Sequence, residues 1–214
     1  VEVNKTYWFQ RLNKGELSLC HYKGFLKETY HQVKYNPQVQ GFATAFFKNN
    51  PRDVIRQFFG HARSEVGHDL LALNDLVNLG VPREFVENSS PLPMTTALNA
   101  YSFFTTMFVN PVSYLGYLFH LEYLPTTSGK ETISKLLSLG VPENAVSFLN
   151  DHAEIDLSHN KMMEDYIDKL ILTKEDLESV IRAMNDTAWI HCQMISDAMK
   201  NGEVEFSESI KKCS

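Results

Sequence analysis

Residues 51–82 read PRDVIRQFFGHARSEVGHDLLALNDLVNLGVP, and this stretch decides the fold class. Its apolar residues recur at spacings of three and four, which is the period of an amphipathic helix. Pro51 can occupy the first turn of a helix that runs to about Leu79. Gly80 then follows as a left-handed cap, with Val81-Pro82 behind it. The stretch therefore predicts a long helix with a sharp end.

The same spacing continues along the rest of the chain, where no clean alternation of apolar and polar residues exceeds about five positions. Thr173 and Asp176 read as a near capping box that opens the last helix. A turn at residues 126–129 should lead into a helix that ends at Leu139. Further helices are predicted over residues 18–35, 37–47, 94–109, 111–123 and 143–170. The class is all-α, with about seven helices in one domain (1–201) and a polar tail (202–214).

Composition narrows the function classes. Of the 214 residues, 43% are hydrophobic and 21% are charged, which is typical of a globular chain with its own core. A net charge of −6 without a Lys/Arg cluster argues against nucleic-acid binding. No apolar stretch approaches the roughly 20 residues that cross a bilayer. The N-terminus lacks the layout of a signal peptide, so we expect a cytoplasmic protein without a membrane span.

Cysteine usage excludes two kinds of site. Cys20, Cys192 and Cys213 are odd in number and widely spaced, so they make neither a disulfide framework nor a CxxC metal motif. We expect reduced thiols.

The phrase Leu79-Gly80-Val81-Pro82 recurs as Leu139-Gly140-Val141-Pro142. One interpretation is a common connection used twice, and the other is a pseudo-repeat. A related motif beside each phrase favours the second interpretation. Both motifs read His-Ala-x-x-acid-x-x-His: His61-Ala-Arg-Ser-Glu65-Val-Gly-His68 and His152-Ala-Glu-Ile-Asp156-Leu-Ser-His159.

These two motifs predict ligand stripes that face the core. Positions i, i+4 and i+7 lie within about 60° of one another on a helix, so each motif presents two imidazoles and one carboxylate together. Burying such groups without partners would cost several kcal/mol each, so they need one. The flanking apolar residues point the stripes inward: Phe58, Leu71, Ala72 and Leu76 for the first, and Phe148, Leu149, Ile155 and Met163 for the second.

Glu122 is a third candidate because it interrupts a heavily apolar helix. Alone, a glutamate there is more often a residue at the surface edge that extends outward. Beside two ligand stripes it is better interpreted as a ligand, since inward-facing acid-x-x-His motifs and single acids build di-iron and di-manganese helical bundles. Imidazole and carboxylate suit iron or manganese, and the lack of nearby thiolates argues against a structural zinc.

A fourth helix should contribute a ligand, and its candidates are His31 and Glu28, three residues apart on one face. For His31 an ordinary core or surface histidine is the competing interpretation. His61 also stays open, because it would add more ligands than two six-coordinate ions with open positions require. The remaining histidines are interpreted as structural: His21, His120 and His191.

The chain resembles the haem-oxygenase-like di-metal oxidases, which share a seven-helix fold with haem oxygenase, thiaminase II and pyrroloquinoline quinone synthase. The resemblance covers nearly the whole chain. It is carried by Tyr30-His31-Gln-Val, Glu65-x-Gly67-His68, Asp75-Leu-x-x-Leu-Gly80, Leu115-Gly116, Glu122 and His152-x-x-x-Asp156-x-x-His159.

This resemblance implies a single haem-oxygenase-like bundle and a defined ligand set. The implied metal ligands are Glu65, His68, Glu122, His152, Asp156 and His159, with His31 nearest to the position where the family's first core helix supplies a glutamate. That departure leaves open whether Glu28 serves instead.

The implied activity is an O2-dependent di-iron oxidoreductase, with a mixed Mn/Fe centre as a variant. Its substrate would be a small amino acid, an amine or a fatty-acid-like molecule, and the family context accommodates an external electron donor and a homodimer. Tyr101, Phe103, Phe104 and Met107 are predicted to wall the pocket, with ordinary core as the competing interpretation. Two alternatives remain: a metal-free enzyme like thiaminase or the quinone synthase, using Cys20 or Cys192, and a non-enzymatic interaction protein with a vestigial metal site.

Overall fold

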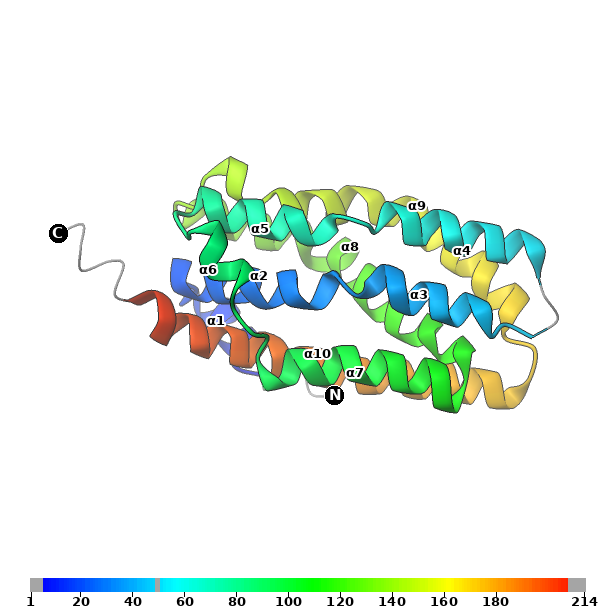
Figure 1. Cartoon of the computed structure of the whole chain (residues 1–214). Coiled ribbons are helices and arrows are strands. Elements are labelled where there is room, and N and C mark those ends of the chain that lie inside the picture. The colour runs from blue at the N-terminus through cyan, green and yellow to red at the C-terminus, as the bar shows by residue number, and fades with distance from the viewer. Residues whose placement is uncertain (1–5, 49–50, 208–214) are drawn as a thin grey trace.

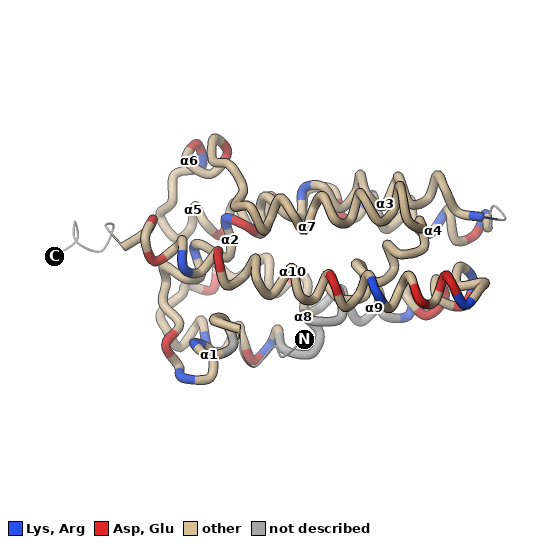
Figure 2. Tube along the Cα trace, turned by 90° about the horizontal axis from the view of Figure 1, so that it is seen from below, with Lys and Arg blue, Asp and Glu red and all other residues tan. Residues whose placement is uncertain are grey.

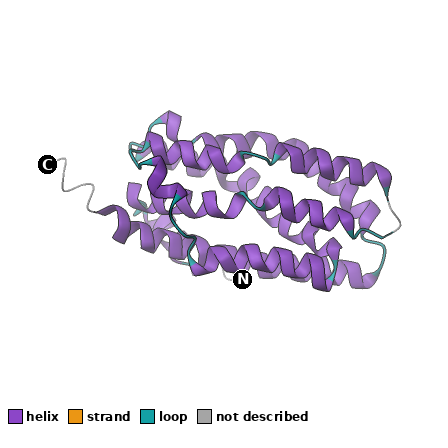
Figure 3. Ribbon diagram, viewed as in Figure 1, coloured by secondary structure: helices purple, strands orange, loops and turns teal. Residues whose placement is uncertain are grey.

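The computed structural model describes residues 6–48 and 51–207, except for the side chains of residues 9, 123–128 and 154–160. The described chain is helical and contains no strand, which confirms the all-α prediction (Figure 3). Its α-helices are α1 (Tyr7–Lys14), α2 (Leu19–Val33), α3 (Asn36–Ala45), α4 (Arg52–Ser64), α5 (His68–Asn78), α6 (Arg83–Glu87), α7 (Pro93–Phe104), α8 (Tyr114–Ser138), α9 (Ser147–Leu170) and α10 (Lys174–Phe206). There are more of them than the seven expected, because α1 and α6 are short additions and one predicted helix is broken.

The helices run side by side along one long axis (Figure 1). α2 and α3 follow each other end to end, and so do α4 and α5. The long helix α10 packs chiefly on α2 and α8, while α8 also packs on α9. Lys and Arg are scattered among Asp and Glu over the described helices (Figure 2). None of the described helices combines the length and the apolar character needed to cross a membrane.

The core contains two apolar clusters. One contains Phe58 of α4 and Tyr166 of α9, and the other contains Leu76 of α5 and Phe148 of α9. The long helix α8 joins both, through its first turns and through Leu136. The polar candidates of α4, α5, α8 and α9 therefore come from helices that build these two apolar clusters.

The helix predicted over residues 51–79 is broken at Gly67, and the prediction of one continuous helix is wrong. Gly67 has a φ of 98°, a conformation that glycine adopts without the steric cost of a Cβ. Glu65 is the C-cap of α4, and His68 is the first residue of α5. The break matters for function because it changes the directions in which Glu65 and His68 project from the chain. The second His-Ala motif, in contrast, lies within an uninterrupted α9.

The turn predicted at residues 126–129 is also wrong, because α8 runs unbroken from Tyr114 to Ser138. The glycine at position 129 is explained by packing instead, because a Cβ built on it would lie 3.2 Å from the Cβ of Ala153 in α9. The glycine therefore marks a close approach of two helices. The predicted break at Asn110 is confirmed, with α7, a π-helical turn (Thr105–Val109) and a 3-10 turn (Pro111–Ser113) before α8.

Both copies of the Leu-Gly-Val-Pro phrase end a helix in the same way. Val81 N donates to Leu76 O at 3.0 Å and Val141 N donates to Leu136 O at 3.1 Å, each across a left-handed glycine. A 3-10 turn (Glu143–Ala145) follows the second copy before α9 begins.

The helix α10 continues beyond the predicted domain boundary at residue 201, because its last turns are packed. Gly202 and Phe206 are both buried. Of the cysteines, Cys20 and Cys192 are free thiols, and Cys213 lies outside the described residues.

Asp176 ties the start of α10 to the α7–α8 connection, which yields a stability prediction. Its carboxylate accepts hydrogen bonds from Asn110 Nδ2 (2.8 Å), Thr173 N (3.1 Å) and Leu172 N (3.2 Å). Asp176→Ala should lower the free energy of unfolding by about 1–2 kcal/mol, as measured by urea denaturation at pH 7. Glu175→Ala, which changes an exposed residue of the same turn, should lower it far less.

The effect of Asp176 should also depend on pH. Burial raises the pKa of this carboxyl, but the hydrogen bond from Asn110 and those from residues 172 and 173 outweigh it and hold the pKa below its ordinary value. A depressed native pKa adds stability that is fully present above the unfolded value of about 4 and is lost as the pH falls through the native value. The difference between the wild type and Asp176→Ala should therefore narrow below about pH 4, and a constant difference would contradict this account.

Candidate metal centre

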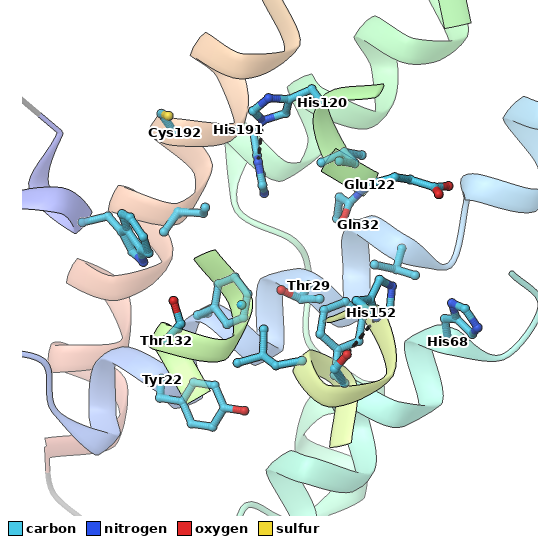
Figure 4. A pocket seen from close by; sticks show the side chains of 18 of the residues that line it. Tyr22, Thr29, Gln32, His68, His120, Glu122, Thr132, His152, His191 and Cys192 are labelled. Carbon is cyan, nitrogen blue, oxygen red and sulfur yellow. Dashed lines mark hydrogen bonds between the residues drawn. The ribbon is translucent and has the colours of Figure 1, made fainter. Parts of the chain in front are cut away.

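Four of the predicted ligands meet where α4, α5, α8 and α9 face one another. Glu65 comes from the end of α4, His68 from the start of α5, Glu122 from α8 and His152 from α9. Figure 4 shows His68, Glu122 and His152 on one side of a shared cavity. The side chains of Asp156 and His159 lie outside the described residues, so their roles stay predictions.

One group of potential ligands consists of the buried residues His61, Glu65 and Glu122, whose ligand atoms lie within 4.8 Å of one another. His61 Nε2 lies 2.8 Å from Glu122 Oε1 and 3.6 Å from Glu65 Oε1. Burial alone would lower the pKa of His61, but the hydrogen bonds with Glu122 and Glu65 outweigh it and raise the pKa to about 9. Two buried carboxylates therefore face one nitrogen of the His61 ring, and their negative charge would also stabilise a metal cation there.

A second group consists of His68, Asp151 and His152. His68 Nδ1 lies 3.5 Å from Glu65 Oε1, and its Nε2 lies 3.7 Å from Asp151 Oδ2. The hydrogen bond with Glu65 raises the pKa of His68. The rings of His68 and His152 stand edge to face with their centroids 5.1 Å apart. Glu65 thus lies beside both groups and links them.

The ring of His152 is held in one orientation by its own helix. Its Nδ1 lies 2.8 Å from the carbonyl oxygen of Phe148, one turn earlier in α9. A carbonyl only accepts, so Nδ1 carries the proton and Nε2 keeps its lone pair. Burial lowers the pKa of the ring, which favours this neutral form. Fixing one nitrogen to a carbonyl is how metal-binding histidines are commonly held.

The donor set fits iron or manganese. It combines imidazole nitrogens and carboxylate oxygens, and neither group contains a thiolate. His68 Nδ1 is buried with Glu65 Oε1 3.5 Å away, so an imidazole donor and a carboxylate donor adjoin there. Glu65 belongs to the first group, and its Oε1 lies 3.5 Å from His68 Nδ1 of the second group, so the two groups adjoin.

The first core helix places its candidates elsewhere. His31 Nε2 lies 2.8 Å from Ser89 Oγ. Glu28 accepts hydrogen bonds from Leu92 N and Thr95 Oγ1, so it attaches α2 to the start of α7. In the part of the chain that the structure describes, neither residue joins the two groups, and we leave both out of the proposed ligand set.

Asp151 is a candidate that the spacing argument missed. It precedes His152 directly, and neighbouring residues of a helix point about 100° apart, so no shared stripe announces it. Only the packing of α5 against α9 brings His68 to its carboxylate.

The cavity beside these ligands has a volume of about 210 Å³. Glu65, His68, Glu122 and His152 form its polar side, and much of the rest is apolar: Trp8, Leu17, Phe25, Leu118, Leu121, Ile195 and Met199. The predicted wall from residues 94–109 is wrong, because none of those residues lines the cavity. Phe104 is instead 56% exposed and Met107 is 40% exposed, so these two are not ordinary core either.

Comparisons with known proteins agree with this geometry. A family model described as iron-containing redox enzyme matches residues 23–191. A domain of unknown function with a haem oxygenase-like fold from Shewanella denitrificans has 27% sequence identity and a TM-score of 0.87, and the alignment covers 96% of this chain and 88% of that one. None of the curated proteins compared with this chain matches it.

More distant solved structures share the fold. A TenA homologue from P. horikoshii has 13% identity and a TM-score of 0.74, with 93% of this chain and 92% of that chain covered. A CADD-like protein of unknown function from Nostoc punctiforme has 16% identity and a TM-score of 0.68, with coverages of 94% and 89%. The predicted haem-oxygenase-like fold is therefore confirmed.

Proposed function

The chain belongs to the iron-containing redox enzyme family, and from that premise we propose that it is an oxidoreductase that activates O2 at a di-iron or mixed Mn/Fe centre. The proposed ligands are Glu65, His68, Glu122, His152, Asp156 and His159. One observation carries the proposal: four of them converge from separate helices on one side of a largely apolar cavity.

When bound, the ions would supply the electrons that reduce O2 for the oxidation of a substrate. The chain's own task is to hold and orient. The carbonyl of Phe148 fixes the His152 ring, Glu65 connects the two ligand groups, and His61 lies within 2.8 Å of Glu122 and positions that carboxylate. The apolar residues exclude water from the reacting partners. The cavity volume of about 210 Å³ suits a small amino acid, an amine or a short fatty-acid-like molecule.

A metal-free enzyme on this fold would need a working thiol in the cavity. Cys192 lines the cavity, but burial raises the pKa of its thiol, which disfavours the reactive thiolate. Cys20 is not among the lining residues. These observations favour the metal-dependent reading.

Anaerobic reconstitution with ferrous iron tests the proposal. We expect about two iron ions per chain and, when O2 is added, O2 uptake with a new near-ultraviolet absorption band. His159→Ala should abolish O2 uptake. Fewer than about 0.2 iron or manganese ions per chain, with the same O2 uptake in His159→Ala, would contradict the proposal.

A further inference from the structure

A second pair of histidines, His120 of α8 and His191 of α10, also lies at the cavity. His120 Nε2 is 3.0 Å from His191 Nδ1, and both residues line the cavity. Figure 4 shows the pair away from His68, with the His191 ring extending from α10 into the cavity. Because Nδ1 of His191 is engaged with His120, Nε2 is the nitrogen left for a ligand. The candidate metal centre does not use this pair.

The packing of α8 on α10 explains where the pair lies. A Cβ on Gly116 would be 2.2 Å from Val180 O and 2.6 Å from Met184 N, so the two helices touch there. His120 follows Gly116 by about one turn, and His191 follows Met184 by about two turns on the same face of α10. The rings of His120 and His191 meet edge to face with their centroids 5.2 Å apart, and both residues line the cavity.

The pair can serve a neutral ligand group. A hydrogen bond between two imidazole nitrogens needs one proton, so at least one ring is neutral. The direction of the shared proton decides whether His191 Nε2 donates or accepts. A hydroxyl group of the ligand can pair with Nε2 in either case, because it can both donate and accept. A carbonyl group can pair with it only when Nε2 donates.

The surroundings disfavour a charged group at this position. Leu121 and Ile195 flank the pair in the cavity lining, and no Lys or Arg is present among the described lining residues. Moving a charge out of water beside this hydrogen-bonded pair, of which at least one ring is neutral, would cost far more than moving a hydroxyl that gains a hydrogen bond.

Building on the proposed function, we propose that His191, oriented by His120, is a specificity-determining residue that binds a hydroxyl or carbonyl group of an otherwise apolar substrate. The apolar body of that substrate then extends along the cavity toward His152 and the metal ligands. Within the fatty-acid-like class proposed above, this favours uncharged amphipathic molecules, such as fatty alcohols or aldehydes, over amino acids, amines and carboxylates.

Nitrogen-15 NMR of the histidine rings tests this assignment, with 1-octanol and octanoate as matched probes. We expect 1-octanol to shift the His191 Nε2 resonance and to bind at least about tenfold more tightly than octanoate. His191→Phe, which keeps a ring but removes both nitrogens, should weaken octanol binding about three- to tenfold in calorimetry. Trp189→Phe, a change at an exposed residue of α10 that does not line the cavity, should leave octanol binding unchanged.

Two results would overturn the inference: a His191 resonance that 1-octanol does not move, or octanoate binding as tightly as 1-octanol. The wild-type NMR experiment decides even if His191→Phe fails to fold. This test can fail independently of the proposed function, because the iron content of the same preparation is measured separately. Iron binding without a His191 shift removes only this inference, whereas a His191 shift without iron binding removes only the di-metal oxidase.

Discussion

Glu65→Gln is expected to lower the iron content of the reconstituted protein from about two ions per chain to fewer than about 0.2. Glu65 Oε1 lies 3.5 Å from His68 Nδ1 and 3.6 Å from His61 Nε2, so it stands beside both ligand groups. The amide of glutamine has nearly the same shape but no negative charge. Even partners outside the ligand set change metal affinity about 10- to 100-fold, so losing a shared ligand should cost more. Elemental analysis after desalting measures the effect.

His31→Gln is the matched control. His31 is buried like Glu65, but its Nε2 forms a hydrogen bond with Ser89 Oγ, and the amide of glutamine can keep that hydrogen bond. The variant should therefore retain its iron. Full iron in Glu65→Gln, or loss of iron from a folded His31→Gln protein, would contradict the proposed ligand set and return His31 to it.

Gly24→Ala is expected to destabilise the fold by about 3 kcal/mol. A Cβ at this position would lie 2.1 Å from Ala198 O and 3.0 Å from Gly202 Cα, and both obstacles are backbone. The contact can be relieved only by moving α2 away from α10. A Cβ built on Gly202 of α10 would approach Cys20 O of α2 almost as closely. Urea denaturation followed by circular dichroism measures the loss.

Gly41→Ala provides the comparison, because Gly41 lies within α3 and a Cβ there would meet nothing within 4 Å. Alanine in a helix interior is favoured over glycine by roughly 0.5–1 kcal/mol, so this variant should be slightly more stable than the wild type. Equal effects at Gly24 and Gly41 would show that the α2–α10 contact is not close-packed.

Features set by a few neighbouring residues could be predicted from the sequence. The capping box of Thr173 and Asp176, the end of α5 at Gly80 and the break at Asn110 all follow from local hydrogen bonds and backbone preferences. The convergence of Glu65, His68, Glu122 and His152 was also within reach, because polar residues at helical spacing inside apolar segments need buried partners.

Features that depend on the packing of distant segments could not be predicted from local sequence. A glycine in a helical segment can have either of two roles: Gly67 breaks a helix, whereas Gly129 lets a neighbouring helix approach closely. The pairing of His120 with His191 joins residues far apart in the chain, so spacing gave no hint of it. His31 and Glu28 share the composition of ligands, but their partners Ser89 and Thr95 come from another segment.

Anomalous X-ray diffraction at the iron edge, from crystals of the reconstituted protein, tests the central claim most directly. The account predicts two iron peaks about 4 Å apart between α4, α5, α8 and α9, bounded by Glu65, His68, Glu122 and His152. Asp156 and His159 should complete their coordination. An iron-loaded crystal with no peak among these side chains, or with its iron bound elsewhere on the chain, would contradict it.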